Sequence, residues 1–518
     1  MIRPGEPLTR VELFGLVVGL LLAMALMWPV RNYITDDTFI HLQYARNLAA
    51  GAGLVFNPGE RVYGCTSPLW VALIADGMVL GFDGLAWARV MGFLATLSSV
   101  GLFLQLMRRT VPTPAVRAAA TVAWAGHAWL ARWSLSGMET PLAVALVLAG
   151  FAAFTEGKQW GARPVRTGAL WAIAALTRPE AALLLLLWGA FLLIDAENRA
   201  GLRRLVAGSL PPLVIYGGWM LFARVYFGTF WPQTLAAKAA GSTATVFNAD
   251  NLVRQAKLIG ATDGALVAVL GLALVFGGRA VWPHAWLSAQ RLVPWAWVLA
   301  LPTLYLTRGI PVLSRYVLPL LPVLAWLAWR AANRWWLGPD PTALRVRRAG
   351  WLAAGLAAVI LAQNFAIYRT AVLPQVQSFS PALKAGLVRW GTWFHAHTHR
   401  EAVIATPDIG AIGYFSQRRV VDLAGLITPE MVPHLVRETP EQVVAEFRFA
   451  SFSRPDFLVD RASRPYELLR TSPYATCLVP LGTALVPNLG LARPEPATYS
   501  FYRVDWGVFD SLRAQRAR

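Results

Sequence analysis

The sequence predicts a mostly α-helical, polytopic membrane protein, with about eleven membrane-spanning helices in residues 1–372 and a C-terminal α/β domain in residues 373–518. Three observations predict this fold class. The chain is 56% hydrophobic and only 14% charged, whereas soluble domains carry about 25% charged residues. Its 23 tryptophans suit a membrane protein, because indole rings favour the membrane interface. Long apolar runs recur until the hydropathy falls near residue 372.

The predicted spans follow one another along the chain. A span needs about 20 apolar residues, and fewer where neighbours bury its ends. Residues 11–30 lack a small-residue cleavage site, so we interpret them as an uncleaved first span rather than a signal peptide. Residues 68–81 are too short for a span and predict a re-entrant or interfacial helix. The other predicted spans are 85–107, 114–131, 139–155, 167–177, 181–196, 205–225, 262–278, 292–307, 313–329 and 350–369.

The net charge of +19 sets the predicted orientation. In a soluble protein this excess would suggest nucleic acid. Here the basic residues fall in alternate short loops, which the positive-inside rule explains, so we expect membrane lipid and no nucleic acid as a partner. The chain is therefore expected in the plasma (inner) membrane, with a cytoplasmic N-terminus and an extracytoplasmic C-terminal domain. The bases of the predicted inner loops are Arg108, Arg109, Arg117, Lys158, Arg163, Arg166, Arg199, Arg203, Arg204, Arg279, Arg291, Arg330, Arg334, Arg345, Arg347 and Arg348.

The C-terminal region changes to a strand-like pattern. Residues 401–426 predict a buried strand, a Gly-rich turn, a short helix and a second strand, and residues 456–460 predict another strand. The region is long enough to form its own core. The chain has two cysteines, Cys65 and Cys477, which are too few for a disulfide framework or a metal cluster. The sequence leaves open whether these two form one disulfide bridge.

The outer loop 31–84 begins with two adjacent acids, Asp36 and Asp37, directly after the first span. Adjacent carboxylates repel, so at least one should have a cationic or metal partner or a raised pKa. Alternatively, one of them caps a helix that runs to about Ala50, and both roles can hold together. Tyr44 and Arg46 lie on this helix and face either a substrate, solvent or the protein interior.

Further polar residues gather on the same predicted side of the membrane. Glu139 begins a span, where an acid can also simply complement the helix dipole. Arg178 and Glu180 lie between two spans. They either take part in substrate binding or form an ion pair that only fixes the turn. The remaining candidates on this side are Asn57 in the first loop, Gln233 and Lys238 after the seventh span, and Arg308 and Arg315 around a tight loop.

These residue types suit one class of reaction. Carboxylates can take a proton from a hydroxyl, and arginine and lysine can bind a phosphate. A lipid-linked phosphosugar would donate its sugar to a hydroxyl while the cations stabilise the departing phosphate. The candidate catalytic residues are Asp36, Asp37 and Glu139; the candidate donor-phosphate residues are Arg178, Lys238, Arg308 and Arg315; the candidate substrate-binding residues are Tyr44, Arg46, Asn57, Glu180 and Gln233.

Six motifs carry a resemblance to a known family: DDTFIHLQYARNLAAGAGLVFNPGERVYGCTSPLW, SGMETPL, LTRPE, YFGTFWPQTLAAK, RYVLPLLP and DIGAIGYFSQRRVVDLAGL. In this order they resemble the polytopic GT-C superfamily of glycosyltransferases, in the branch that includes mycobacterial terminal β-(1→2) arabinofuranosyltransferases. The resemblance implies a polyprenyl-phosphate sugar donor, an inverting transfer, and an acid of the first outer loop as the base. It favours Asp36 over Asp37 for that role.

The chain departs from this pattern at two places. Tyr63 stands where relatives have a glutamate, and Pro232-Gln233-Thr234 replaces Pro-Asn-Thr. These departures leave the transferred sugar undecided between arabinofuranose, mannose and another pentose or hexose. They also leave the acceptor undecided between a cell-envelope glycan, a lipid and a protein hydroxyl. Some members of the superfamily use a divalent metal ion and others do not. Asp36 and Asp37 are the expected ligands of any such ion.

A transporter or flippase of lipid-linked sugars is the alternative function. It would also need many spans and buried charges. Transporters commonly show paired repeats and broken helices near the middle of the membrane. In this sequence the charges gather at one face instead, which favours the enzyme.

Overall fold

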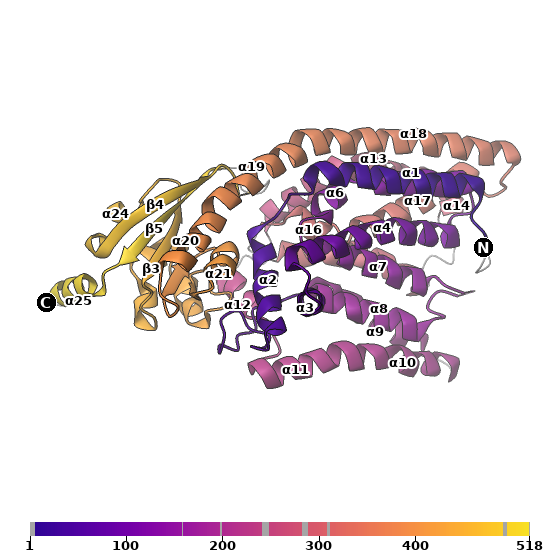
Figure 1. The fold of residues 1–518 in the computed structure, drawn as a ribbon. Coiled ribbons are helices and arrows are strands. Elements are labelled where there is room, and N and C mark those ends of the chain that lie inside the picture. The colour runs from indigo at the N-terminus through magenta and orange to yellow at the C-terminus, as the bar shows by residue number, and fades with distance from the viewer. Residues whose placement is uncertain are drawn as a thin grey trace.

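The computed structural model describes residues 6–157, 159–196, 199–240, 248–281, 289–307, 311–489 and 495–516. Long helices lie side by side as a bundle, and a sheet stands at one end of it (Figure 1). We call this end of the bundle the sheet end and the opposite end, where the N-terminus lies, the far end.

Most of the predicted spans coincide with helices of the bundle. The predicted span 313–329 is wrong by eight residues at each end, because the helix α17 runs from Leu321 to Leu337. The break within the predicted span 114–131 falls at Gly126 and His127, between α5 and α6. The bundle helices are α1 (Arg10–Met27), α4 (Gly84–Thr110), α5 (Pro114–Ala125), α6 (Ala128–Ser134), α7 (Thr140–Phe154), α8 (Pro164–Thr177), α9 (Ala182–Asp195), α10 (Arg199–Pro212), α11 (Gly218–Phe227), α13 (Ala249–Phe276), α15 (Ala289–Leu306), α17 (Leu321–Leu337) and α18 (Ala343–Ile367).

Within the described residues, five helices are long and apolar enough to cross a membrane by length and composition, and several shorter apolar helices lie between them. The mostly α-helical membrane architecture is thus confirmed, while the count of about eleven spans stays a prediction. The helix pair α10 and α11 differs from the other long apolar helices in how little of it is buried. Almost none of its apolar stretch is buried, and Pro211 and Pro212 lead into a π-helical turn at Leu213–Gly217.

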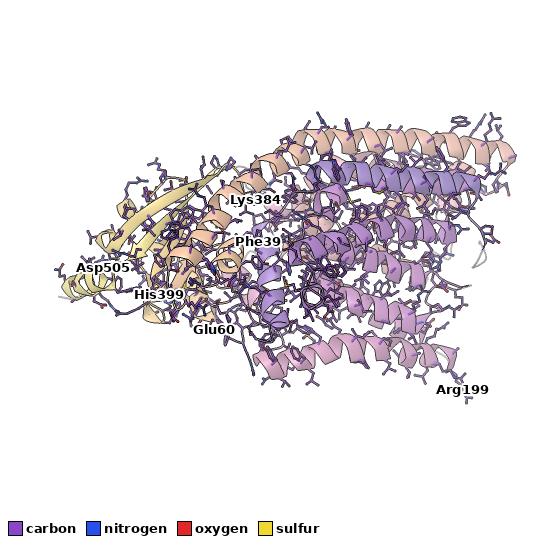
Figure 2. All side chains as sticks on the ribbon, viewed as in Figure 1. Phe39, Glu60, Arg199, Lys384, His399 and Asp505 are labelled. Atoms are coloured by element: carbon purple, nitrogen blue, oxygen red, sulfur yellow. The ribbon has the colours of Figure 1, made fainter. Side chains whose placement is uncertain are left out.

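The first loop forms two short helices at the sheet end. Helix α2 (Asp36–Ala49) runs across the bundle instead of along it (Figure 1), and α3 (Pro68–Val79) confirms the helix predicted at 68–81. The loop between them turns at Gly53, whose φ of +92° few other residues adopt. Phe39 and Glu60 of this loop lie beside the C-terminal elements, whereas Arg199 lies at the far end (Figure 2).

The last span does not stop at the predicted domain boundary. Helix α18 continues through a π-turn into α19 (Leu373–Leu383) and α20 (Arg389–His397), forming one helix of 55 residues. The predicted boundary between 372 and 373 lies inside this helix.

The described part of the C-terminal region contains a five-stranded sheet of order β2-β1-β3-β5-β4. Strand β1 pairs in parallel with β2 and β3, whereas β5 pairs antiparallel with β3 and β4. The predicted strand–helix–strand unit is confirmed as β1, α21 and β2, and the strand predicted at 456–460 is β3. The elements are β1 (Val403–Thr406), α21 (Gly410–Ser416), β2 (Arg419–Asp422), α22 (Val432–Arg437), α23 (Pro440–Ala445), β3 (Phe457–Ala462), α24 (Leu468–Thr471), β4 (Leu478–Val486), β5 (Ala497–Val504) and α25 (Trp506–Arg516).

The sheet has a hydrophobic cluster on each face. One cluster is continuous with the bundle: Trp390 of α20 stacks on Phe501 of β5, with ring centroids 4.1 Å apart. The second cluster lies under α22 to α25 and includes Phe447. Cys65 belongs to the first cluster and Cys477 to the second, and both are free thiols among the described residues.

Candidate active site

Two cavities meet at the sheet end of the described chain. The first, of about 710 Å³, lies between α2, α6, α13 and the C-terminal region, and we call it the C-terminal cavity. The second, of about 440 Å³, lies between the first loop, α8, α9, α11 and α15, and we call it the lateral cavity. Asp37, Arg315 and Tyr316 line both cavities. These three residues form a wall that the two cavities share.

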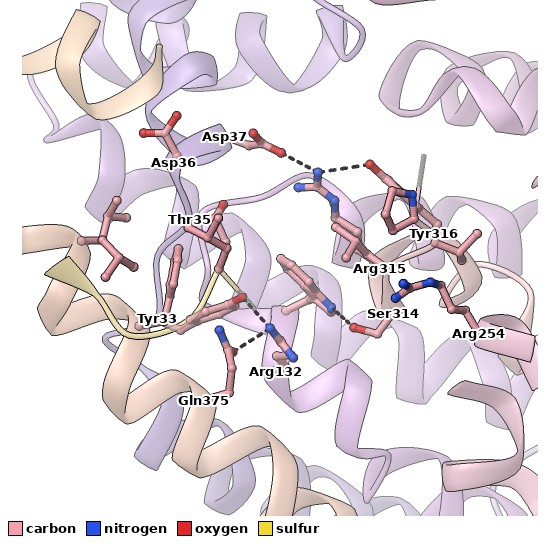
Figure 3. Close-up of a pocket in the computed structure, with 18 of the residues that line it drawn as sticks. Tyr33, Thr35, Asp36, Asp37, Arg132, Arg254, Ser314, Arg315, Tyr316 and Gln375 are labelled. Carbon is pink, nitrogen blue, oxygen red and sulfur yellow. Dashed lines mark hydrogen bonds and ion pairs between the residues drawn. The ribbon is translucent and has the colours of Figure 1, made fainter. Parts of the chain in front are cut away.

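Asp37 forms an ion pair with Arg315 at this junction (Figure 3). Asp37 lies in the first turn of α2, where a negative charge complements the helix dipole. Its side chain is 45% exposed, whereas that of Arg315 is 10% exposed. The interpretation of Asp36 or Asp37 as the N-cap of this helix is wrong, because Thr35 occupies the N-cap position.

The Asp36 carboxylate contacts the C-terminal region instead. It accepts hydrogen bonds from the backbone N–H groups of Gly410 and Ala411, both at 2.8 Å. These N–H groups lie at the N-terminus of α21. An aspartate of the first loop therefore accepts hydrogen bonds from the first turn of a helix that is distant in the sequence. Burial, and then the charge of the nearby Asp408, raise the pKa of Asp36 to about 7.

Asp408 is a third acid at the C-terminal cavity, and it is not among the site residues predicted from the sequence. Its carboxylate accepts hydrogen bonds from Arg461 at 2.8 Å and from the Tyr499 hydroxyl at 2.6 Å. Asp408 lies two residues after the end of β1, at the carboxyl edge of parallel strands, where ligands bind in many α/β folds. That position is the signal in the sequence that could have identified it.

Glu139 lies in a buried network of charges on the lateral cavity. Arg178 Nη1 lies 2.7 Å from Glu139, and Arg178 Nη2 lies 3.1 Å from Glu180. His41 Nε2 is 3.4 Å from the second oxygen of Glu139, and Tyr305 donates its hydroxyl to Glu180 at 2.5 Å. Arg178 is thus already balanced by two carboxylates.

Arg315 is held by aromatic rings as well as by Asp37. Its guanidinium lies 5.7 Å from the ring centroid of Trp133 and 5.2 Å from that of Tyr316. Because Asp37 is its only acidic partner in the described ion pairs, Arg315 keeps more capacity for an anion than Arg178 does. The other two predicted phosphate contacts, Arg308 and the side chain of Lys238, lie outside the described residues.

The predicted substrate-binding residues separate into two groups. Tyr44 and Glu180 line the lateral cavity. Three others line neither cavity and join the first loop to other elements. Arg46 donates to the Tyr414 carbonyl at 2.8 Å, Asn57 bonds both backbone groups of Val420 at 2.8 and 3.0 Å, and the Gln233 backbone donates to the Tyr63 carbonyl at 2.7 Å.

Other polar residues of the C-terminal cavity were not predicted from the sequence. Arg132 reaches it from α6, and Arg254 and Lys257 reach it from α13. The latter two lie before the predicted span 262–278, but they belong to the same helix, because α13 begins at Ala249.

The described residues contain no group of three or more His, Cys, Asp or Glu side chains placed to hold a metal ion. The two expected ligands also have separate partners, since Asp36 binds backbone N–H groups and Asp37 binds Arg315. This arrangement does not fit a shared metal site, and no step below uses one.

Comparison with known proteins relates the chain to glycosyltransferases. It is 33% identical over 229 residues to a terminal β-(1→2)-arabinofuranosyltransferase of Mycobacterium tuberculosis, a match that covers 40% of this chain and 35% of the relative. It is 28% identical over 248 residues to the protein of the same description from Corynebacterium glutamicum, covering 40% and 34%. The chain thus matches about a third of the length of these relatives. Residues 375–502 match a domain of unknown function, DUF8728.

Solved structures share the fold over nearly the whole chain. ArnT from Cupriavidus metallidurans, bound to undecaprenyl phosphate, superposes with a TM-score of 0.58 at 15% identity, covering 94% of this chain and 97% of ArnT. The mycobacterial arabinofuranosyltransferase AftD gives a TM-score of 0.54 at 18% identity, covering 96% of this chain and 40% of AftD. The resemblance to GT-C glycosyltransferases is confirmed, and the chain is an integral membrane protein with their fold.

Proposed function

We propose that this chain is a membrane glycosyltransferase that moves a sugar from a polyprenyl-phosphate donor to a hydroxyl acceptor with inversion at the anomeric carbon. The observation that carries the proposal is the Asp37–Arg315 pair at the junction of two cavities. A transfer reaction needs two substrates that meet at one point, with a base on one side and an anion-binding group on the other.

The lateral cavity suits the lipid-linked donor. It is walled by α9 and α11, and Leu186 lines it while remaining 70% exposed. A prenyl chain could therefore enter from the apolar surface of the bundle. Arg315 also lines this cavity, and it could bind the phosphate to which the prenyl chain is attached. Undecaprenyl phosphate bound to ArnT supports a donor of this kind.

The C-terminal cavity suits the acceptor. Residues of the C-terminal region line it, including Asp408, Arg461 and Tyr499. Polar groups of this kind can hold the hydroxyls of a sugar. An acceptor in this cavity would present a hydroxyl to Asp37, which lines the cavity close to Arg315.

The chemistry follows from this placement. Asp37 takes the proton of the acceptor hydroxyl while that oxygen attacks the anomeric carbon of the donor. The bond from the anomeric carbon to the phosphate oxygen breaks, and polyprenyl phosphate leaves with the electron pair. Arg315 stabilises the negative charge on the leaving phosphate. One displacement inverts the anomeric configuration, and the proton on Asp37 is later lost to water.

Asp37 is our preferred base because it lines both cavities, whereas the Asp36 carboxylate is bound to the end of α21. We expect Asp37→Asn to lower turnover by about 10²–10⁴-fold, and Asp36→Asn to lower it less. The assay uses the full chain in nanodiscs with polyprenyl-phosphate arabinofuranose and other pentose or hexose donors. Near-normal turnover in Asp37→Asn, together with a large loss in Asp36→Asn, would identify Asp36 as the catalytic base instead.

The same proposal predicts a product in the cell. Mass spectrometry of cell-envelope glycans, with and without the chain, should show the loss of one sugar residue. NMR of the product made in nanodiscs should show inverted anomeric configuration. Movement of the intact lipid-linked sugar across the membrane, without a glycosylated product, would instead support the flippase.

A further inference from the structure

Arg132 places a positive charge in the wall of the C-terminal cavity, and no acid of the described residues forms an ion pair with it. It is 4% exposed. Its Nη2 donates to the Tyr33 hydroxyl at 2.9 Å and to Gln375 Oε1 at 2.7 Å, both neutral groups (Figure 3). Among the described residues no carboxylate forms an ion pair with it, and its Nε has no hydrogen-bond partner. Buried charges are normally paired, so Arg132 is a candidate to bind an anion.

Other cations surround the same space. The guanidinium groups of Arg132 and Arg315 lie 5.3 and 5.7 Å from the centroid of the Trp133 ring, so both lie near the same indole. Arg254 and Lys257, three residues apart on α13, line the cavity from another side. Positive groups from three helices thus face one volume.

Three of the four acids that line this cavity are already engaged, and the fourth, Asp250, lies on α13 four residues before Arg254. Asp408 is held by Arg461 at 2.8 Å, and Asp37 by Arg315. Asp36 receives two backbone N–H groups. These acids therefore do little to balance Arg132.

We infer that the acceptor of the transfer reaction carries a phosphate group, which Arg132 binds in the C-terminal cavity with help from Arg254 and Lys257. The inference rests on the proposed function, because it names the chemistry of one of its two substrates. Arginine binds phosphate through parallel N–H groups, and a doubly charged phosphate matches several cations better than a neutral sugar does. We assign the acceptor to this cavity because its lining from the C-terminal region is polar and includes Asp408, Arg461 and Tyr499. The C-terminal lining of the lateral cavity is apolar, and that cavity borders the apolar helices α9 and α11.

The first test measures binding without the reaction. Full-length protein in nanodiscs is titrated with inorganic phosphate, at ionic strength held constant with chloride, and binding is followed by the shift in thermal unfolding. We expect Arg132→Gln to weaken phosphate binding about 10–100-fold and to leave the ligand-free melting temperature equal or higher, since a buried unpaired charge is removed. Arg454→Gln, in an exposed pair with Asp510, is the control and should bind as the wild type does.

Unchanged phosphate affinity in Arg132→Gln would overturn the site. If that variant does not fold, the double variant Arg254→Gln/Lys257→Gln replaces it, since Lys257 is exposed and Arg254 only partly buried. Phosphate binding as in the wild type would then overturn the site as well.

The second test separates the acceptor from the donor. Undecaprenyl phosphate in the nanodisc should bind Arg132→Gln as well as the wild type, and Arg315→Gln more weakly. Equal weakening of inorganic phosphate and undecaprenyl phosphate by Arg132→Gln would assign Arg132 to the donor and overturn the acceptor inference. Neither measurement needs turnover, so a failure of the proposed transfer activity would show separately in the nanodisc assay.

Discussion

Asp36 and Asp37 are adjacent in the sequence but have different partners. Asp37 pairs with Arg315 between the cavities, while Asp36 accepts two backbone N–H groups from α21. Adjacent residues on a helix point about 100° apart, so the two carboxylates are free to serve different surfaces. The expected cationic partner of the pair is therefore found, but it belongs to Asp37.

The raised pKa of Asp36 gives a prediction for pH dependence. Burial and the charge of Asp408 raise this pKa from 3.8 to about 7. The stability that protonated Asp36 contributes is therefore present below about pH 4 and is lost as the pH rises through about 7. Asp408→Asn removes one cause and should shift this loss to lower pH. Thermal unfolding between pH 4 and pH 8 measures it. In the control Asp36→Asn the step should be smaller, and what is left belongs to Asp422, whose pKa burial also raises to about 7.

An unchanged pH profile in Asp408→Asn would mean that the charge of Asp408 does not act on Asp36. The same profiles bear on catalysis. Turnover that rises through about pH 7 in the wild type, and at lower pH in Asp408→Asn, would identify Asp36 as the base.

Arg178 gives a prediction about stability rather than donor binding. It lies buried between Glu139 and Glu180. Arg178→Gln leaves two buried carboxylates without their partner, so we expect unfolding to become easier by about 3–5 kcal/mol. Arg454→Gln breaks an exposed pair and should cost about 1 kcal/mol or less. Chemical denaturation in detergent compares the two.

Normal stability with weakened binding of undecaprenyl phosphate in Arg178→Gln would restore Arg178 as a contact of the donor phosphate. Loss of stability with unchanged donor binding would instead assign it to the ion-pair network that fixes the turn after α8.

The long helix that begins as α18 connects the bundle to the sheet. Its last part, α20, packs Trp390 against Phe501 of β5. We expect the fragment 373–518, which keeps α19 and α20 but not α18, to fold alone and to melt cooperatively. A fragment that begins at residue 400 exposes Phe501 and should be less stable. Circular dichroism during heating tests both.

A disordered 373–518 fragment would show that the sheet needs the bundle, with which it shares a hydrophobic cluster. Equal stability of the two fragments would show instead that α19 and α20 belong to the bundle alone.

The whole chain should have one orientation in the membrane. The basic predicted loops contain Arg199, which lies at the far end, whereas the acids of the candidate site lie at the sheet end. We expect a cysteine introduced at Asp340 to resist an impermeant thiol reagent in intact cells and a cysteine at Arg513 to react. A Cys65→Ala/Cys477→Ala background removes the native thiols. The opposite labelling pattern would reverse the orientation and place the cavities at the cytoplasmic face.

Much of the architecture could be predicted from the amino-acid sequence because it depends on local patterns. Apolar runs located the helices of the bundle, and the alternation around the Gly-rich turn at 407–410 located β1, α21 and β2. Strands β4 and β5 were not predicted. Strand β4 contains Pro480 and Gly482 at an irregularity in its pairing, and both residues weaken a strand pattern. It lies at the edge of the sheet, where such residues are tolerated.

The sequence also identified some of the charged groups of the candidate site, such as Asp37, Glu139 and Arg315, since charged residues next to apolar spans stand out. It did not identify Asp408 or Arg132. It could not show their partners. Asp36 meets Gly410 across 374 positions of the chain, Arg178 meets Glu139 across 39, and Arg132 meets Gln375 across 243. Such contacts depend on how helices pack, and local hydropathy carries no information about that packing. The membrane class and the GT-C resemblance therefore follow from the sequence, whereas the partner of each charge, and the cavity it faces, follow from the fold.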